Sequence, residues 1–291
     1  MVKRILAILS VLAALQGNVM AAEQIRFNES VLPYQDGYLI PNFGTQEKVP
    51  APEQADGYIL YYDNSTKTLN DFIPADGDMV RPTGMAVYNN KLYICNKTNV
   101  LVYDLADLKK APQTIAFADD DREVNDAVVC GGKLYVTVTD TDRIYEIDLA
   151  AENPLPHKWV DIPGPNGIAA YNDTIYVVSI PADYATVTDE NVVYVVKNRN
   201  NPVLEKFNST PGLYDGVAVS DDGKMVYVSD WLTTSVKAID TATKKEQIVY
   251  QAKDLSPADF ALDKNKLLIP DMMKHRVIVY DLNDNSEQII E

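Results

Sequence analysis

Short runs of alternating apolar and polar residues, rich in Val, Ile and Tyr, recur along the chain between turn residues. In the stretch 213–231, one run is entered through Asp215 and Gly216, a turn follows at 221–223, and a second run ends at Asp230 and Trp231. Alternation with β-branched residues predicts two strands, and the Asp-Asp-Gly turn predicts that they pair as a hairpin.

The same hairpin recurs six times. The small or acidic residue before each first strand is Ser30, Gly84, Asp126, Gly167, Gly216 or Asp259, with spacings of 54, 42, 41, 49 and 43 residues. Second strands are predicted at 91–94, 133–136 and 266–269, third strands at 100–104, 143–148, 236–240 and 277–281, and fourth strands at 113–117 and 246–250.

Four antiparallel strands in each such repeat predict an all-β six-bladed β-propeller. A β-sandwich would not need six matching hairpins, and a β-helix repeat is much shorter. The blades are expected near residues 23–75, 76–119, 120–163, 164–208, 209–252 and 253–291.

Two repeats carry long insertions between their second and third strands, at residues 44–55 and 181–191. In a propeller this connection lies on the same face as the entry to the first strand. Both insertions are therefore expected over the mouth of the central channel. Loops of this length are usually functional or disordered. The insertions are therefore expected either to form a lid or wall of a substrate site or to have no role in function.

The first 22 residues predict an export signal. Lys3 and Arg4 precede an apolar run at 5–15, and small residues end at Ala21 and Ala22. This pattern is typical of a signal peptide cleaved after one of those alanines, and the apolar run is too short to cross a bilayer. We expect an exported protein, periplasmic or secreted, that is not inserted in a membrane; an uncleaved anchor is the alternative.

The net charge is −16, and it becomes more negative when the signal peptide is removed. Such a chain is repelled by nucleic acid and by anionic membranes, and favours neutral or cationic partners or metal ions.

Cys95 and Cys130 fall at strand ends expected on opposite faces, too far apart for a disulfide. Two free thiols are predicted, although export would permit a bond.

The residues that enter the first strands are expected to converge at the channel mouth, because first strands line the axis of a propeller. They are Glu29, Thr83, Asn125, Asn166, Asp215 and Ala258. Two carboxylates and two amides suit a hard divalent cation, and no Cys or His joins them. The alternative is that Asn-Gly and Asp-Gly are ordinary turn residues, although a Glu is a poor turn residue and needs a partner near the axis.

The same positions carry a resemblance to a known family. With Glu29, Asn125-Asp126, Pro165-Asn166-Gly167 and Asp215-Gly216, the chain resembles the SMP-30/gluconolactonase-like six-bladed propellers from about Phe27 to its end. The resemblance implies one divalent cation, calcium first, with zinc, magnesium or manganese as alternatives. It implies Glu29, Asn166 and Asp215 as the metal ligands, and Asn125 as a substrate or metal contact.

The chain departs from the family pattern at two places. The family's Arg-x-Asn-Asp motif corresponds to Arg122, but one extra residue separates this arginine from Asn125. Glu29 is followed by Ser30 and Val31 rather than by Gly-Pro and an aromatic residue. These departures leave the metal ligands better matched than the substrate contacts.

Two functions follow as hypotheses. The first is an exported, metal-dependent hydrolase of a lactone or related ester, such as a sugar lactone, in which the cation polarises the carbonyl. The resemblance implies Asp215 as both ligand and general base. The expected substrate contacts are Asn125, Arg122, Asp230 and Trp231, with the indole stacking on a sugar-like face.

The second hypothesis is a non-catalytic propeller that contains the metal and binds a ligand or partner protein in the periplasm.

Two further expectations concern the surroundings of the site. In the hydrolase hypothesis, His275 is an alternative to Asp215 as the general base. The ends of the second strands are expected to form an outer ring around the mouth: Asn42, Asn96, Ser179, Asp230 and Asp271.

Overall fold

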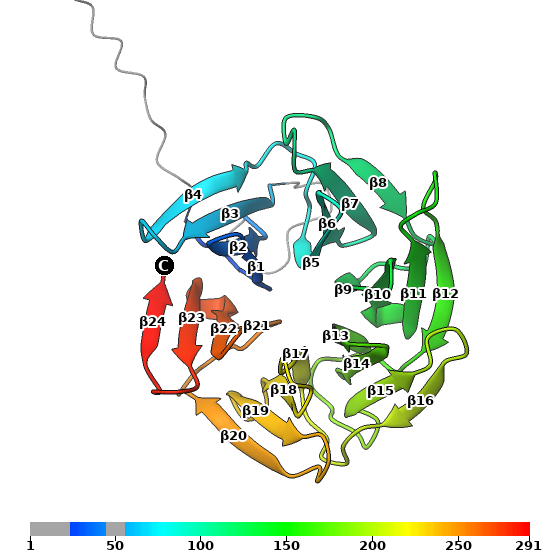
Figure 1. The fold of residues 1–291 in the computed structure, drawn as a ribbon, viewed down its shortest axis with the longest axis vertical. Coiled ribbons are helices and arrows are strands. Elements are labelled where there is room, and N and C mark those ends of the chain that lie inside the picture. Colours follow the sequence, from blue (N-terminus) through cyan, green and yellow to red (C-terminus); the bar gives the residue numbers. More distant parts are fainter. Residues whose placement is uncertain (1–23, 45–55) are drawn as a thin grey trace, which may run out of the picture.

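The chain forms a ring of six four-stranded antiparallel sheets, each built from consecutive strands (Figure 1). The computed structural model describes residues 24–44 and 56–291. The predicted signal peptide and nearly all of the 44–55 insertion lie outside these residues. In the described part, no helix is long and apolar enough to cross a membrane.

The strands follow the predicted order. Blade 1 holds β1 (Leu32–Tyr34), β2 (Gly37–Asn42), β3 (Tyr58–Asp63) and β4 (Thr68–Ile73). Blade 2 holds β5 (Pro82–Tyr88), β6 (Lys91–Asn96), β7 (Asn99–Asp104) and β8 (Gln113–Ala116). Blade 3 holds β9 (Val124–Cys130), β10 (Lys133–Val138), β11 (Arg143–Asp148) and β12 (Pro156–Asp161), with the short 3-10 helix η1 (Thr139–Thr141) after β10.

The second half of the ring repeats this plan. Blade 4 holds β13 (Pro165–Tyr171), β14 (Thr174–Ser179), β15 (Val193–Lys197) and β16 (Val203–Lys206). Blade 5 holds β17 (Tyr214–Val219), β18 (Met225–Asp230), β19 (Ser235–Asp240) and β20 (Glu246–Gln251). Blade 6 holds β21 (Ala261–Asp263), β22 (Lys266–Asp271), β23 (Arg276–Asp281) and β24 (Glu287–Ile290), with the 3-10 helix η2 (Met272–Lys274) after β22. The six-bladed prediction is confirmed.

The core lies between the blades rather than within one central mass. Among the described residues, six buried apolar clusters each join two neighbouring blades. The Val, Ile, Leu and Tyr residues on the two faces of each sheet supply them, because side chains of a strand alternate between faces. Burial of both faces explains why inner strands read as nearly continuous apolar runs.

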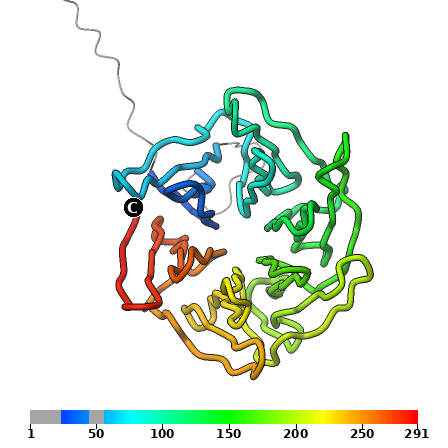
Figure 2. The backbone as a smooth tube through the Cα atoms, viewed as in Figure 1, coloured from blue at the N-terminus to red at the C-terminus, as the bar shows by residue number. Residues whose placement is uncertain are grey.

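In the part of the chain that the structure describes, each blade consists of four consecutive strands, so the ring closes without exchange of a strand. Blade 6 is completed by its own β24, and the cluster between blades 6 and 1 includes Ile290, Leu268 and Tyr62. Gln288 Nε2 also donates to the Tyr62 hydroxyl over 2.6 Å. Figure 2 shows the chain running once around the ring, so that its last residues lie beside the first blade. Residues 24–27 form no strand.

The two cysteines are free and buried, as predicted. Cys95 packs between blades 2 and 3, and Cys130 packs between blades 3 and 4. The Cys130 thiol donates to the carbonyl of Asn172 over 3.1 Å. Each thiol therefore belongs to a different apolar cluster and packs there as a small hydrophobic residue.

Candidate functional site

In blades 2, 4 and 5 the entry residue lies in a bulge at the start of the first strand. Pairing of β5, β13 and β17 with their second strands shifts register between Pro82 and Met85, Pro165 and Ile168, and Tyr214 and Val217. The skipped positions include Thr83, Asn166 and Asp215, which in each case precede a glycine. A bulge turns side chains away from the regular alternation between the two faces of the sheet. Here the bulge lies at the start of the strand, at the mouth of the channel.

Hydrogen bonds between blades hold the backbone of this ring in place. A hydroxyl of one blade donates to the carbonyl of the next entry residue: Ser30 to Thr83 (2.8 Å), Thr83 to Asn125 (2.5 Å), Thr137 to Asn166 (2.7 Å) and Ser229 to Ala258 (3.0 Å). Between blades 6 and 1, the amide of Asp259 donates to the Glu29 carbonyl over 2.9 Å. Thr83 therefore uses its side chain in the blade junction.

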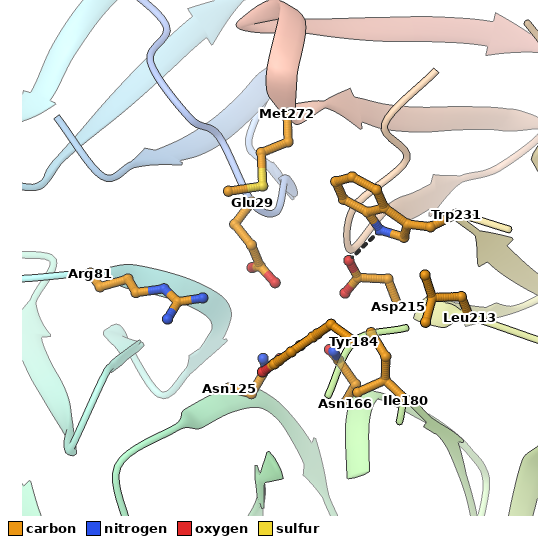
Figure 3. Close-up of a pocket in the computed structure, with 10 residues that line it drawn as sticks. All are labelled: Glu29, Arg81, Asn125, Asn166, Ile180, Tyr184, Leu213, Asp215, Trp231 and Met272. Atoms are coloured by element: carbon orange, nitrogen blue, oxygen red, sulfur yellow. Dashed lines mark hydrogen bonds between the residues drawn. The ribbon is translucent and has the colours of Figure 1, made fainter. Parts of the chain in front are cut away.

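A pocket of about 300 Å³ opens at this end of the channel (Figure 3). Every blade contributes to its lining. The lining residues are Glu29, Arg81, Asn125, Asn166, Ile180, Tyr184, Leu213, Asp215, Trp231 and Met272. The four oxygen-bearing entry residues that the sequence singled out are thus brought together in one pocket.

Four oxygen atoms in this pocket are buried and have no hydrogen-bond partner: Glu29 Oε2, Asn125 Oδ1, Asn166 Oδ1 and Asp215 Oδ1. A buried acceptor without a partner is costly and rare in folded proteins. Carboxylate and amide oxygens are the ligands that hard divalent cations prefer. In the described residues, no three His, Cys, Asp or Glu side chains group to hold a metal ion. The donor set that fits a cation is therefore two carboxylates and two amides.

Both pocket carboxyls hold their protons more tightly than usual. Burial raises the pKa of Asp215 to about 6, opposed by the hydrogen bond from Trp231 and by the charge of Arg81. Burial, followed by repulsion from Asp215 and Asp126, raises the pKa of Glu29 well above its usual range. A divalent cation would relieve both effects because it would compensate the two negative charges.

A second pair of carboxyls lies one residue along from the entry ring. Asp126 and Asp259 come from opposite blades and hydrogen-bond to each other. Asp126 Oδ2 also accepts the amide of Ile168 (2.8 Å), and its Oδ1 accepts that of Ala127 (2.7 Å). Burial raises the pKa of Asp126 to about 7, and burial followed by repulsion from Asp126 raises that of Asp259 well above its usual range.

Glycine at position 84 is required for this pair. A Cβ there would lie 2.0 Å from Asp126 Oδ1, well inside van der Waals contact.

The structure places two of the expected substrate contacts, Asp230 and Arg122, outside the pocket. Trp231 lines the pocket as expected for a substrate contact, and its indole N–H also donates to Asp215 Oδ2 over 2.7 Å. Asp230 is fully buried and outside the pocket lining. Its oxygens accept the amides of Leu213 and Leu232 and pair with Lys237 at 2.6 Å. Arg122 is exposed and lies outside the lining, with its backbone amide bonded to Asp140.

The outer ring at the ends of the second strands is structural rather than part of the pocket. Asn42, Asn96 and Asp271 each accept backbone amides of the segment that leads into the first strand of the same blade. Asp230 does the same for Leu213. A short polar side chain at a strand end often satisfies a neighbouring loop in this way. His275 is likewise engaged, since its Nδ1 accepts the Phe27 amide over 3.0 Å, and it does not line the pocket.

Five of the ten lining residues were not predicted from the sequence, and two of these, Arg81 and Tyr184, carry polar groups. Arg81 stands two residues before the entry residue of blade 2, and its charged end points into the pocket (Figure 3). Tyr184 belongs to the 181–191 insertion, which the structure confirms between β14 and β15. It adopts a left-handed backbone conformation with φ of 53°. The insertion was the only sequence signal for Tyr184.

Comparison with known proteins places the chain by its fold. No family model and no curated protein matches it. Among solved structures, it resembles that of a nidogen/laminin complex with a TM-score of 0.65 and 15% identity, covering 82% of this chain and 91% of that one. A streptogramin B lyase gives a TM-score of 0.62 and 13% identity, covering 92% and 84%.

A third similar structure is a putative 6-phosphogluconolactonase from Bacteroides uniformis, with a TM-score of 0.58 and 15% identity, covering 89% of this chain and 83% of that one. At such identities the likeness concerns the propeller fold alone.

Proposed function

We propose that the protein is an exported, divalent-metal-dependent hydrolase of a lactone or related ester, with its active site at the channel mouth. One observation carries the proposal: four buried oxygens without partners, from Glu29, Asn125, Asn166 and Asp215, converge in one pocket. The sequence resemblance to the SMP-30/gluconolactonase-like propellers supports it, as does the fold shared with a putative lactonase.

Glu29, Asn166 and Asp215 would hold the cation, with Asn125 as a further ligand or a substrate contact. Calcium is the first choice for such oxygens, and zinc, magnesium or manganese are the alternatives. When bound, the cation polarises an ester carbonyl and stabilises the negative charge that develops on its oxygen.

The protein's own residues would supply positioning and proton transfer. Trp231 fixes the Asp215 carboxylate through Oδ2 and leaves Oδ1 facing the pocket. With a pKa raised to about 6, Asp215 is ionised at neutral pH and can accept the proton of an attacking water at Oδ1. Tyr184 and Trp231 line the mouth and would limit access of bulk water once a ligand is bound.

The test combines metal analysis with a lactone screen. Purified protein should contain one divalent cation, hydrolyse at least one lactone, and lose turnover on chelation. Asp215→Asn should abolish turnover while the protein stays folded. Asp221→Asn, in the exposed turn between β17 and β18, is the matched control and should behave as wild type. Protein purified without chelator that is folded but free of metal would overturn the ligand set.

A binding propeller is the second candidate. Among the described residues that line the pocket there is no histidine, cysteine or lysine, which are common proton donors to a leaving group. A bound cation with no turnover on any lactone would favour the binding propeller.

If the protein does turn over a lactone, running the reaction in ¹⁸O-labelled water distinguishes a hydrolase from a lyase. Hydrolysis adds the label to the product acid, whereas elimination does not.

A further inference from the structure

Arg81 is held so that one edge of its guanidinium has no hydrogen-bond partner among the described residues. Its Nη1 donates to Glu123 Oε2 over 2.9 Å, its charged carbon lies 5.0 Å from the centre of the Phe43 ring, and its backbone amide donates to Asn96 Oδ1 over 3.0 Å. Nε is buried without a partner, and among the described residues none accepts from Nη2. A guanidinium edge with two adjacent donors matches the two oxygens of a carboxylate.

The opposite wall of the pocket is apolar. Arg81 belongs to blade 2, and Leu213 and Trp231 belong to blade 5, on the other side of the six-bladed ring (Figures 1 and 3). Ile180 and Met272 extend this wall on either side of blade 5. Apart from the carboxylate of Asp215, whose Oδ2 accepts the Trp231 indole N–H, the side chains of this wall are hydrocarbon, aromatic and thioether groups. The two ends of the pocket therefore differ in chemistry.

Resting on the proposed function, we propose that the ligand is a small ester or lactone with one carboxylate and one apolar group. The carboxylate binds Arg81, the apolar group packs against Leu213 and Trp231, and the reacting carbonyl lies between them, near Asp215. A sugar lactone fits this pocket less well. Its hydroxyl groups would face the apolar wall without hydrogen-bond partners, which costs binding free energy.

The charges of the pocket make carboxylate binding depend on the cation. Glu29 and Asp215 are both acidic, and Glu123 offsets Arg81. Without a cation, an incoming carboxylate meets a net negative mouth and is repelled. A divalent cation would compensate Glu29 and Asp215, so that Arg81 can attract the ligand. Carboxylate affinity is therefore expected only in the metal-loaded protein.

The experiment measures binding, not turnover, by calorimetry of the calcium-loaded protein. The probes are phenylacetate, its neutral isostere phenylacetamide, and acetate, which lacks the apolar group. Phenylacetate should bind about tenfold tighter than phenylacetamide, the size of a charge-assisted bond. It should also bind about tenfold tighter than acetate, the size of one buried apolar group. Chelation should abolish the preference for the charged probe.

Arg81→Gln should bring phenylacetate and phenylacetamide within about twofold of each other, with the affinity for the amide unchanged. Arg81→Lys should retain part of the preference, because charge stays but the planar edge is lost. Lys109→Gln removes one exposed positive charge in the loop between β7 and β8, on the face opposite the mouth, and should behave as wild type. Circular dichroism melts check that each variant is folded.

Equal binding of the two probes by wild type, an equal loss of both in Arg81→Gln, or no binding of either probe would overturn the inference. A lactone screen separates its failure from that of the proposed function. It compares a γ-lactone bearing a carboxylate with the methyl ester of the same compound. If both compounds are hydrolysed at rates that Arg81→Gln does not change, the proposed hydrolase function holds and the inference about Arg81 is wrong. An Arg81-dependent preference without any turnover would do the reverse.

Discussion

The indole N–H of Trp231 donates to Oδ2 of Asp215 over 2.7 Å, while Oδ1 of the same carboxylate is buried without a partner. Asp215 lies near the start of β17 and Trp231 directly follows β18, so the two residues are 16 positions apart in the chain. The hydrogen bond fixes the carboxylate and favours its ionised form. One oxygen is thereby committed to the protein, and the other faces the pocket.

Trp231→Phe removes this hydrogen bond and keeps an aromatic ring at the wall. We expect calcium affinity to fall by about tenfold or more, the usual effect of losing a group that orients a metal ligand. Calorimetric titration with calcium measures it. The other tryptophan is the control: Trp159→Phe loses a bond to the Arg199 carbonyl outside the pocket and should bind calcium as wild type does. Equal affinity in both variants would contradict the positioning role.

Glu29→Gln separates stability from function. The buried Glu29 carboxylate is repelled by Asp215 and Asp126, and the neutral amide removes this repulsion. At pH 8 with chelator, the variant should melt a few degrees higher than wild type. With calcium at about 100 times its Kd, wild type should gain about 2.7 kcal/mol of unfolding free energy, whereas the variant should gain much less. Scanning calorimetry with and without calcium gives both values, and a variant that is less stable than wild type in chelator would refute the repulsion.

The Asp126–Asp259 pair predicts how stability depends on pH in the metal-free protein. Their pKa values are raised in the folded state, to about 7 for Asp126, so the folded protein binds protons that the unfolded chain has already released. The unfolding free energy should therefore fall as pH rises from 5 to 8, by about 1.4 kcal/mol for each unit of pKa shift that is crossed.

Asp259→Asn tests this pH dependence, because the amide can still donate to Asp126 but carries no charge. The fall in stability between pH 5 and 8 should flatten, and the variant should be more stable than wild type at pH 8. Urea unfolding in chelator at each pH measures it. Wild-type stability that instead rises across this range would show that the pair is not the controlling group.

Tyr184→Ala tests whether the 181–191 insertion acts on the ligand. The side chain is 48% exposed and its backbone turn is held by Asp183, so truncation should change the melting temperature by only about 1–2 °C. If the ring covers the bound ligand, KM for the best substrate should rise several-fold. Leu155→Ala, an exposed apolar residue outside the pocket, is the matched control. An unchanged KM would show that Tyr184 of the insertion does not contact the bound ligand.

The sequence by itself determined the propeller and the residues at its mouth. Strand alternation and turn chemistry act between neighbours in the chain, so the repeats of hairpins could be read directly and their number set the number of blades. Once the blades were aligned, equivalent positions had to meet at the axis. Glu29, Asn125, Asn166 and Asp215 could therefore be grouped from the repeat pattern alone.

Only the tertiary structure decided what each polar side chain contacts. Arg81, not Arg122, enters the pocket, because Glu123 of the neighbouring blade and Phe43 of the preceding one hold it there. Asp230 turns back to its own blade and to Lys237, and Trp231 binds Asp215. These choices depend on contacts between residues far apart in the chain, on the direction of each side chain, and on the space that Gly84 leaves beside Asp126. A repeat pattern records where a residue stands in its blade, and the packing of six blades decides which neighbour it meets.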